Sequence, residues 1–251
     1  MRETPIAVLI FVCLVVASLG SLFVHGRLPS HHREDDTHHV VRSVANIFTI
    51  MTSLVLGLMV NSAKNTFESV DRNIHAFATT LIVLDRTLVQ YGAEADATRK
   101  RLLVYTESAA RSVRQDDPPI AGRASEQMLN DTGKGLSAIK PQDAEQIALW
   151  QHAQQQFQKI VELHWIIVEQ SDGTIPMPLL VLLAAWLVLI FASFGYRAPR
   201  NAVVITSFVL ASLLVAGAIY LILDMDVPFS GPIRVSPAPL ERAVVEMRTN
   251  T

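Results

Sequence analysis

One stretch of the sequence, from Asn46 to Tyr91, constrains the fold of this chain more than any other. A stripe of residues recurs there alternately every three and four positions, the spacing of one face of a single long helix. Up to Val60 the stripe is small or polar and its surroundings are apolar, whereas beyond Ala63 the stripe is apolar and its surroundings are polar. The members are Asn46, Thr49, Ser53, Leu56, Val60, Ala63, Phe67, Val70, Ile74, Phe77, Leu81, Leu84, Leu88 and Tyr91. A helix in lipid turns its polar stripe inward and a helix in water turns its apolar stripe inward. We therefore predict one unbroken helix that leaves the membrane with the same face inward throughout.

Four apolar runs have about the 20 residues that a helix needs to cross the hydrocarbon core of a bilayer. They are Ile6–Val24, Val44–Val60, Met177–Phe194 and Ala202–Leu223. Half of the 251 residues are hydrophobic and 18% are charged, which is too apolar for an ordinary soluble protein. The first run resembles a secretory signal peptide, but it is long for one and Ala17-Ser18-Leu19-Gly20 is a poor cleavage site. We therefore expect the run to be retained, in a multi-pass protein of the cell (inner) membrane with the lipid bilayer as its partner.

Helical periodicity continues between the second and third apolar runs, and no strand pattern occurs anywhere in the sequence. After the long helix, which Gly92 would end, further helices are expected over Ala95–Val113, Gly122–Ile139 and Pro141–Gln170. The simplest packing sets the long helix antiparallel to the last one, with the two middle helices capping the far end. The tail is polar with four prolines, so it is expected to be partly disordered.

The predicted fold is therefore an all-α membrane protein, with four transmembrane helices and an extramembrane helical domain between the second and third. Residues 1–60 hold two spans and a His-rich loop, residues 61–175 the coiled-coil-like domain, residues 176–223 the other two spans, and residues 224–251 an interfacial tail. Both termini and residues 61–175 lie on one side of the membrane. The basic residues near the membrane ends do not decide which side that is.

The loop Gly26–His39 is rich in metal-ligating side chains. Imidazole and carboxylate groups are the usual ligands of zinc, and this loop holds four histidines and three carboxylates close together. The candidate ligands are His31, His32, His38 and His39. Their spacing matches no closed metal site, so a solvated polar loop is the alternative interpretation.

A second candidate cation site follows the fourth apolar run. Asp224 and Asp226 oppose the negative end of the helix dipole, so a compensating charge is expected nearby. Arg234, a basic residue of the helical domain, or a divalent cation held by oxygen ligands would supply it. The alternative is an interfacial turn with a local salt bridge, which has no role beyond structure.

The polar part of the stripe has two interpretations. Asn46, Thr49 and Ser53 would line a pore, because hydroxyl and amide dipoles solvate an ion without the cost of a buried charge. Asn61 and Lys64 would then lie at its mouth, and Lys64 would favour anions. The alternative is helix packing, in which small polar side chains allow close contact and hydrogen-bond across spans.

Several segments resemble the bacterial bestrophin-like family in the same order along the chain. They are Arg27-Leu28-Pro29-Ser30-His31-His32, Met51-Thr52-Ser53-Leu54-Val55-Leu56-Gly57-Leu58, Asn61-Ser62-Ala63-Lys64, Leu84-Asp85-Arg86, Tyr91-Gly92, Ala198-Pro199-Arg200-Asn201 and Asp224-Met225-Asp226-Val227-Pro228-Phe229-Ser230-Gly231. The last segment is the most specific.

The resemblance implies a fold and an activity. Bestrophins are pentameric anion channels with four spans per chain, a second helix that lines the pore, and acidic residues after the fourth span that sense calcium. This sequence has a polar-striped second span and a carboxylate pair in the corresponding places. It lacks the long acidic cluster of the calcium-gated members and an aromatic constriction in the second span. The resemblance therefore implies a homo-oligomeric anion channel that passes small ions, without implying calcium gating.

Other classes of function are less well supported by the residues. A non-conducting membrane adaptor or sensor is the main alternative, with the glutamine-rich run Gln151–Gln158 as a surface for protein contacts. No phosphate-binding loop or nucleophile–base arrangement occurs, so we expect no enzyme and no catalytic residue. No cofactor is expected beyond the divalent cation considered above. The net charge of −2 gives no reason to expect a nucleic acid as a partner.

Overall fold

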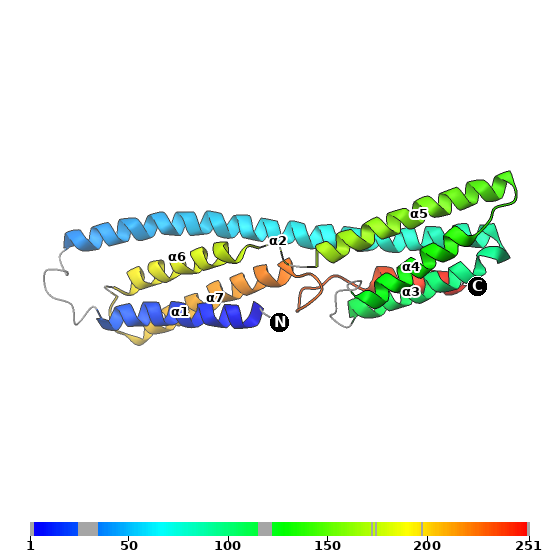
Figure 1. The fold of residues 1–251 in the computed structure, drawn as a ribbon. Helices are drawn as coiled ribbons and strands as arrows, with labels where there is room; N and C mark the ends of the chain where they lie inside the picture. Colours follow the sequence, from blue (N-terminus) through cyan, green and yellow to red (C-terminus); the bar gives the residue numbers. More distant parts are fainter. Residues whose placement is uncertain are drawn as a thin grey trace. The chain divides into compact units, whose positions relative to one another are not determined.

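The computed structural model of the chain describes residues 3–24, 35–114, 122–171, 173, 175–196 and 198–249, and side chains at 24, 35–39 and 41 are outside this description. Helices account for nearly all of these residues, and no strand occurs among them (Figure 1). The α-helices are α1 (Glu3–Val24), α2 (Asp35–Tyr91), α3 (Asp96–Arg114), α4 (Arg123–Ala138), α5 (Ala144–Glu169), α6 (Met177–Gly195), α7 (Ala202–Asp226) and α8 (Ala238–Thr249), with the 3₁₀ helix η3 (Ala93–Ala95) after α2. The predicted all-α fold is confirmed.

The chain forms two compact units, which are described separately. The membrane unit comprises Met1–Asn65 and Thr174–Asp226, and the helical unit comprises Thr66–Gly173 and Val227–Thr251. Helix α2 contributes to both units and is continuous over 57 residues, so the prediction of one unbroken helix is confirmed. The helix begins at Asp35, and the expectation of a loop as far as His39 is wrong. The sequence favours this early start, because acidic residues are common in the first turn of a helix and the pair Asp35-Asp36 stands at this point.

Four helices of the membrane unit are long and apolar enough to cross a bilayer, as predicted: α1, the first part of α2, α6 and α7. Helix α1 packs against both α6 and α7. The core between them is aliphatic and includes Leu14, Leu183 and Ile219. Ser212 and Ala216, two small residues four positions apart in α7, are both buried.

The end of α6 approaches α1 closely enough to exclude any side chain. A Cβ atom on Gly195 would lie 2.2 Å from the carbonyl oxygen of Ser18. We expect Gly195→Ala to lower the free energy of unfolding by about 1–3 kcal/mol, because the helices must move apart. Gly217→Ala in α7 is the matched control, since nothing lies within 4 Å of its added Cβ. Thermal unfolding in detergent measures both, and an equal effect of the two substitutions would contradict the close approach.

The helical unit is a bundle in which α5 and α3 both run antiparallel to α2. Asn73 Nδ2 donates to Gln170 Oε1 over 2.8 Å, while the Phe77 ring meets the Tyr105 ring edge-on. The apolar stripe of α2 from Val70 to Tyr91 is buried in the core, as predicted.

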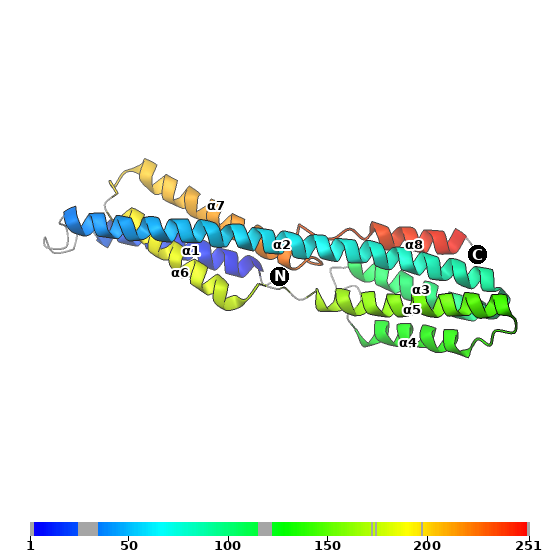
Figure 2. The same ribbon diagram turned by 90° about the horizontal axis from the view of Figure 1, so that it is seen from above.

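The prediction that the two middle helices cap the far end of this bundle is wrong. Helix α3 lies lengthwise beside α2, and α4 packs against α3 and α5 (Figure 2). The physical reason is that α3 has its own apolar face, with Leu102, Tyr105 and Ala109 buried, and such a face needs a partner along its full length.

The C-terminal tail is more ordered than predicted. Helix α7 continues to Asp226, and residues Ala238–Thr249 form α8, which packs on α3. Leu240, Ala243 and Met247 are buried, and their spacing is that of one helix face. The four prolines all precede this stripe, and Pro239 lies in the first turn, where proline is tolerated.

Candidate functional site

The membrane-spanning part of α2 buries a different face from the one expected. Ala45, Thr52 and Met59 are buried, whereas the stripe residues Asn46 and Ser53 are exposed on the chain. The prediction that the same face stays inward throughout is therefore wrong in the membrane unit. About five full turns of a 3.6-residue helix separate Ala45 from the buried Ala63, so both lie on one side. The buried residues Ala45, Thr52 and Met59 also recur every seven positions, each one position before the predicted Asn46, Ser53 and Val60, so the two faces differ by about 100° throughout.

The exposed surface of α2 divides into two parts. At about 100° per residue, Ile50, Leu54 and Asn61 point directly away from the buried face, while Asn46 and Ser53 lie about a quarter to a third of a turn from it. Ile50 is 71% exposed and Leu54 66% exposed. Sequence analysis missed the apolar part. In the sequence, Ile50 and Leu54 lie about half a turn around the helix from the small residues Ala45 and Ala63. That offset could have identified the apolar part if Ala45 and Ala63 had been taken as the buried face.

All five predicted pore-lining residues belong to the exposed surface. Asn46, Thr49, Ser53, Asn61 and Lys64 are each exposed on the chain. The Thr49 hydroxyl donates to the carbonyl of Ala45 over 2.8 Å, and the Ser53 hydroxyl donates to the carbonyl of Thr49 over 2.9 Å. Because each hydroxyl proton is bonded within the helix, the oxygen lone pairs remain on the outer surface. Packing against another helix of the same chain does not explain these side chains.

Basic residues lie at both ends of this surface. Arg42 and Lys64 are exposed, and about 33 Å of helix separates them at 1.5 Å per residue. That distance is close to the thickness of the hydrocarbon core, about 30 Å. The surface between them therefore has the length of a bilayer crossing.

The carboxylate pair at the end of α7 is buried. Asp224 and Asp226 are both buried, and Asp226 Oδ2 accepts a hydrogen bond from the backbone N–H of Ile175 over 3.0 Å. Asp226 thus connects the end of α7 with the residues that precede α6. Arg234 is exposed and belongs to the helical unit. No three His, Cys, Asp or Glu side chains converge within the described residues, and the cation considered for this pair stays a prediction.

The His-rich metal site also stays a prediction. The side chains of His31, His32, His38 and His39 lie outside the described residues.

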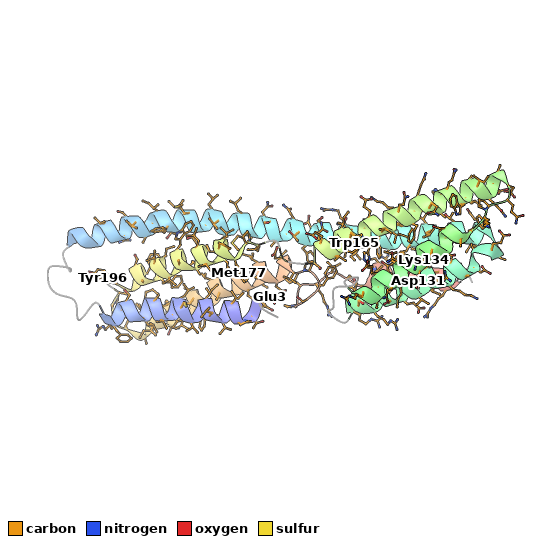
Figure 3. The ribbon with its side chains drawn as sticks, viewed as in Figure 1. Glu3, Asp131, Lys134, Trp165, Met177 and Tyr196 are labelled. Carbon is orange, nitrogen blue, oxygen red and sulfur yellow. The ribbon has the colours of Figure 1, made fainter. Side chains whose placement is uncertain are left out.

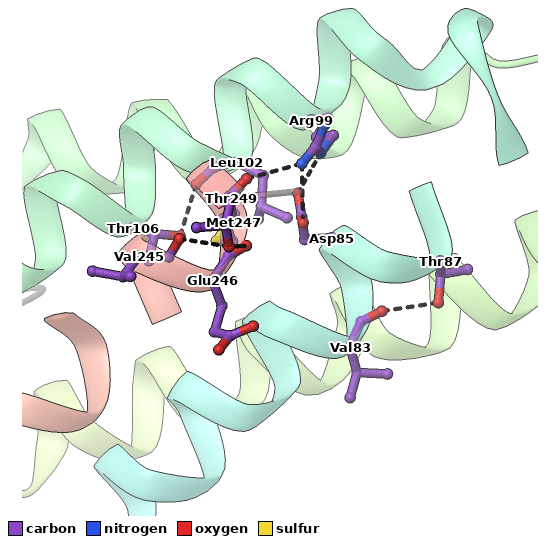
Figure 4. Close-up of polar contacts among 10 residues, drawn as sticks. All are labelled: Val83, Asp85, Thr87, Arg99, Leu102, Thr106, Val245, Glu246, Met247 and Thr249. Atoms are coloured by element: carbon purple, nitrogen blue, oxygen red, sulfur yellow. Dashed lines mark hydrogen bonds and ion pairs between the residues drawn. The ribbon is translucent and has the colours of Figure 1, made fainter. Parts of the chain in front are cut away.

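Two buried polar contacts in the helical unit were not predicted. Arg99 Nε donates to Asp85 Oδ1 over 2.7 Å, and Arg99 Nη2 donates to the carbonyl of Met247 over 2.9 Å (Figure 4). The Tyr105 hydroxyl lies 2.9 Å from Nδ1 of His164. Burial lowers the pKa of His164 from 6.5 to about 4, because the charged imidazolium loses its hydration.

Comparisons with known proteins agree on the fold. A family model described as a Bestrophin-like domain matches residues 12–240. None of the curated proteins matches the chain.

Several solved structures of membrane proteins are similar to this chain over nearly its whole length. A crystal structure of a point variant of a bacterial bestrophin homologue from Klebsiella pneumoniae has a TM-score of 0.72 at 10% identity, covering 97% of this chain and 98% of that chain. A structure of that homologue phased on zinc has a TM-score of 0.71 at 13% identity, covering 97% of each chain. A structure described only as a membrane protein has a TM-score of 0.70 at 11% identity, covering 97% of this chain and 98% of that chain. At these identities, the likeness shows the fold alone.

Proposed function

Because the chain belongs to the bestrophin-like family, we propose that copies of it assemble into a homo-oligomeric channel in which the exposed surface of α2 lines an anion pathway. The family resemblance found in the sequence is the reason to expect anion conduction. The exposed polar surface of α2 is the reason to expect that α2 lies next to the pathway. We place this channel in the cell (inner) membrane.

The observation that carries the proposal is the exposure of polar side chains on a helix of bilayer length. Asn46, Thr49 and Ser53 are uncovered in the single chain, and an amide or hydroxyl group is disfavoured against lipid. A ring of copies removes these groups from the lipid by turning the surface toward water or toward a neighbouring copy. Ile50 and Leu54 on the same exposed surface would form an apolar narrow part, and Asn61 would face the pathway beyond it.

The charges at the two ends favour anions over cations. In a ring, the Arg42 and Lys64 side chains of every copy are brought together at the two mouths. A mouth lined by positive charge raises the local concentration of anions and lowers that of cations. We therefore expect chloride and nitrate to pass in preference to potassium.

Purified protein reconstituted into liposomes tests this function. We expect chloride and nitrate flux, and we expect Lys64→Glu to shift the anion-to-cation permeability ratio by about tenfold toward cations, because one mouth changes sign. Lys134→Glu in α4 is the matched control, since Lys134 is an exposed lysine of the helical unit. Protein that passes no ion at any pH would contradict the proposal.

A non-conducting adaptor or sensor is the second candidate function. The observation in its favour is the surface of α5, where Gln151, Gln155 and Gln158 are exposed beside few charges. Such a surface suits protein contacts, because uncharged groups are less costly to desolvate than charged ones. Stable folded protein that binds a partner and carries no flux would favour this function over the channel.

A further inference from the structure

The helical unit leaves one tryptophan half uncovered. Trp165 on α5 (Figure 3) is 52% exposed. Its ring meets the His164 ring edge-on at 5.2 Å between centroids. Glu162 and Glu169, on the same side of α5, are also exposed. Aromatic side chains of this kind are enriched among the residues that dominate protein interfaces. An exposed indole beside two carboxylates is therefore a candidate contact residue.

A groove of the matching kind lies between α2 and α8. Its volume is about 690 Å³. Its apolar lining comes from Ala78, Ile82, Pro239 and Val245. Its charged lining is mixed and consists of Arg86, Glu241, Arg242 and Glu246, of which Arg86 and Glu246 form an ion pair. Within the described part of the chain, the guanidinium of Arg242 has only a backbone partner, the carbonyl of Ala238 at 3.4 Å. The groove therefore offers apolar surface together with a guanidinium, that of Arg242, which forms no ion pair within the described residues.

The tryptophan and the groove lie on opposite sides of α2. Gln170 at the end of α5 bonds with both Ser69 and Asn73, which places α5 on that side of α2. Ile82 follows Asn73 by nine residues, which is about two and a half helical turns, so it points to the other side. Figure 2 shows α5 and α8 on opposite sides of α2 accordingly.

The two features also lie at the same level along α2. The Asn73–Gln170 hydrogen bond fixes the register of the antiparallel helices. Trp165 precedes Gln170 by five residues, so it lies at the level of the residue five positions after Asn73. That residue is Ala78, which lines the groove.

We infer that Trp165 of one copy occupies the groove between α2 and α8 of the next copy, an inference that rests on the homo-oligomeric channel proposed above. In a closed ring, each copy has two different contact surfaces. The first surface of one copy meets the second surface of the next copy. Two surfaces on opposite sides of a helix that crosses the membrane, at one level, satisfy this condition. The partner of the groove is therefore a second copy of this chain.

The chemistry of the two surfaces is complementary. The indole would fill the apolar part lined by Ile82 and Val245. A guanidinium within about 6 Å of an indole ring is attracted by its electron-rich face, which gives Arg242 a partner.

Cross-linking between copies tests the contact. In a Cys13→Ser background, copies that carry Trp165→Cys are co-expressed with copies that carry Val245→Cys, and membranes are treated with a short bismaleimide. We expect a covalent dimer only when both cysteines are present. Ile147→Cys replaces Trp165→Cys as the matched control. Ile147 is an exposed residue of α5, about five turns and 27 Å from Trp165 on the same face. This control should give about tenfold less dimer, because its effective concentration at the groove is low.

The cross-linking yield is interpreted together with the mass of the purified protein, which shows whether the protein is oligomeric. Cross-linking of Trp165→Cys well above the Ile147→Cys control supports the contact. Equal, weak cross-linking in protein that is still oligomeric overturns the contact and leaves the channel proposal standing. Protein that is monomeric in a lipid nanodisc overturns both.

Discussion

Replacing Asp85 with alanine is expected to destabilise the helical unit by about 3–5 kcal/mol, because it leaves the Arg99 guanidinium buried without its carboxylate. Asp85 is 1% exposed, and Arg99 binds both of its carboxylate oxygens. Arg99 also holds the carbonyl of Met247 near the end of α8, so α8 should loosen in the same variant. Thermal unfolding followed by circular dichroism measures the first effect, and faster proteolysis of α8 reports the second.

A surface ion pair serves as the control for Asp85→Ala. Arg86 and Glu246 are 3.5 Å apart and both well exposed, so Glu246→Ala should cost no more than about 1 kcal/mol. Replacing Asp85 and Arg99 together with leucine and methionine should restore most of the stability, because no buried charge then remains unpaired. An Asp85→Ala protein as stable as Glu246→Ala would show that the buried pair does not hold the bundle.

The second large effect is a loss of stability in mild acid. His164 is 1% exposed and its pKa is lowered by burial to about 4. Below pH 6.5 the unfolded chain binds a proton at this residue that the folded chain does not, so stability falls as the pH falls. The loss should reach about 3 kcal/mol near pH 4 and stop there, because the folded form then binds the proton as well. Unfolding curves between pH 7.5 and 4 measure it.

A paired substitution isolates the contribution of His164 from that of other groups. His164→Phe with Tyr105→Phe removes the imidazole without leaving the tyrosine hydroxyl unpaired. The stability of the double variant relative to that of the parent should therefore rise by about 3 kcal/mol as the pH falls from 6.5 to 4. His152→Phe on the same helix is the control, since His152 is exposed, and it should keep the parent's pH dependence. A double variant with the same pH dependence as the parent would contradict the assignment.

The accuracy of the sequence interpretation differed between the two units for a physical reason. In water, the inward face of a helix is the apolar face, so Phe77, Leu81 and Leu84 identified the core correctly. In lipid, the inside and the outside of a bundle are both apolar, so hydrophobicity does not identify the buried side. The polar stripe through Asn46 and Ser53 was expected to face inward, whereas it lies on the exposed surface of the single chain.

The features that sequence analysis missed depend on contacts between distant segments. Asp85 in a run of Leu-Asp-Arg is typical of a solvated helix position, and only the return of α3 brings Arg99 beside it. His164 lies on the buried face of its own helix, but its partner Tyr105 comes from another helix. The position of α8 follows likewise from α3, on whose surface Leu240 and Met247 are covered.

Accessibility of single cysteines on α2 tests the central claim most directly. In a Cys13→Ser background, cysteines at Ser53 and Leu54 lie on the exposed surface, and cysteines at Thr52 and Met59 lie on the buried one. A negatively charged thiol reagent reacts with the thiolate form of a cysteine. Both the reagent and the thiolate require water around the cysteine. We predict that it reduces chloride flux through liposomes that contain the Ser53→Cys or Leu54→Cys protein, and leaves flux through the Thr52→Cys and Met59→Cys proteins unchanged. Flux that responds only at Thr52 and Met59, or at none of the four positions, would contradict a pathway along the exposed surface of α2.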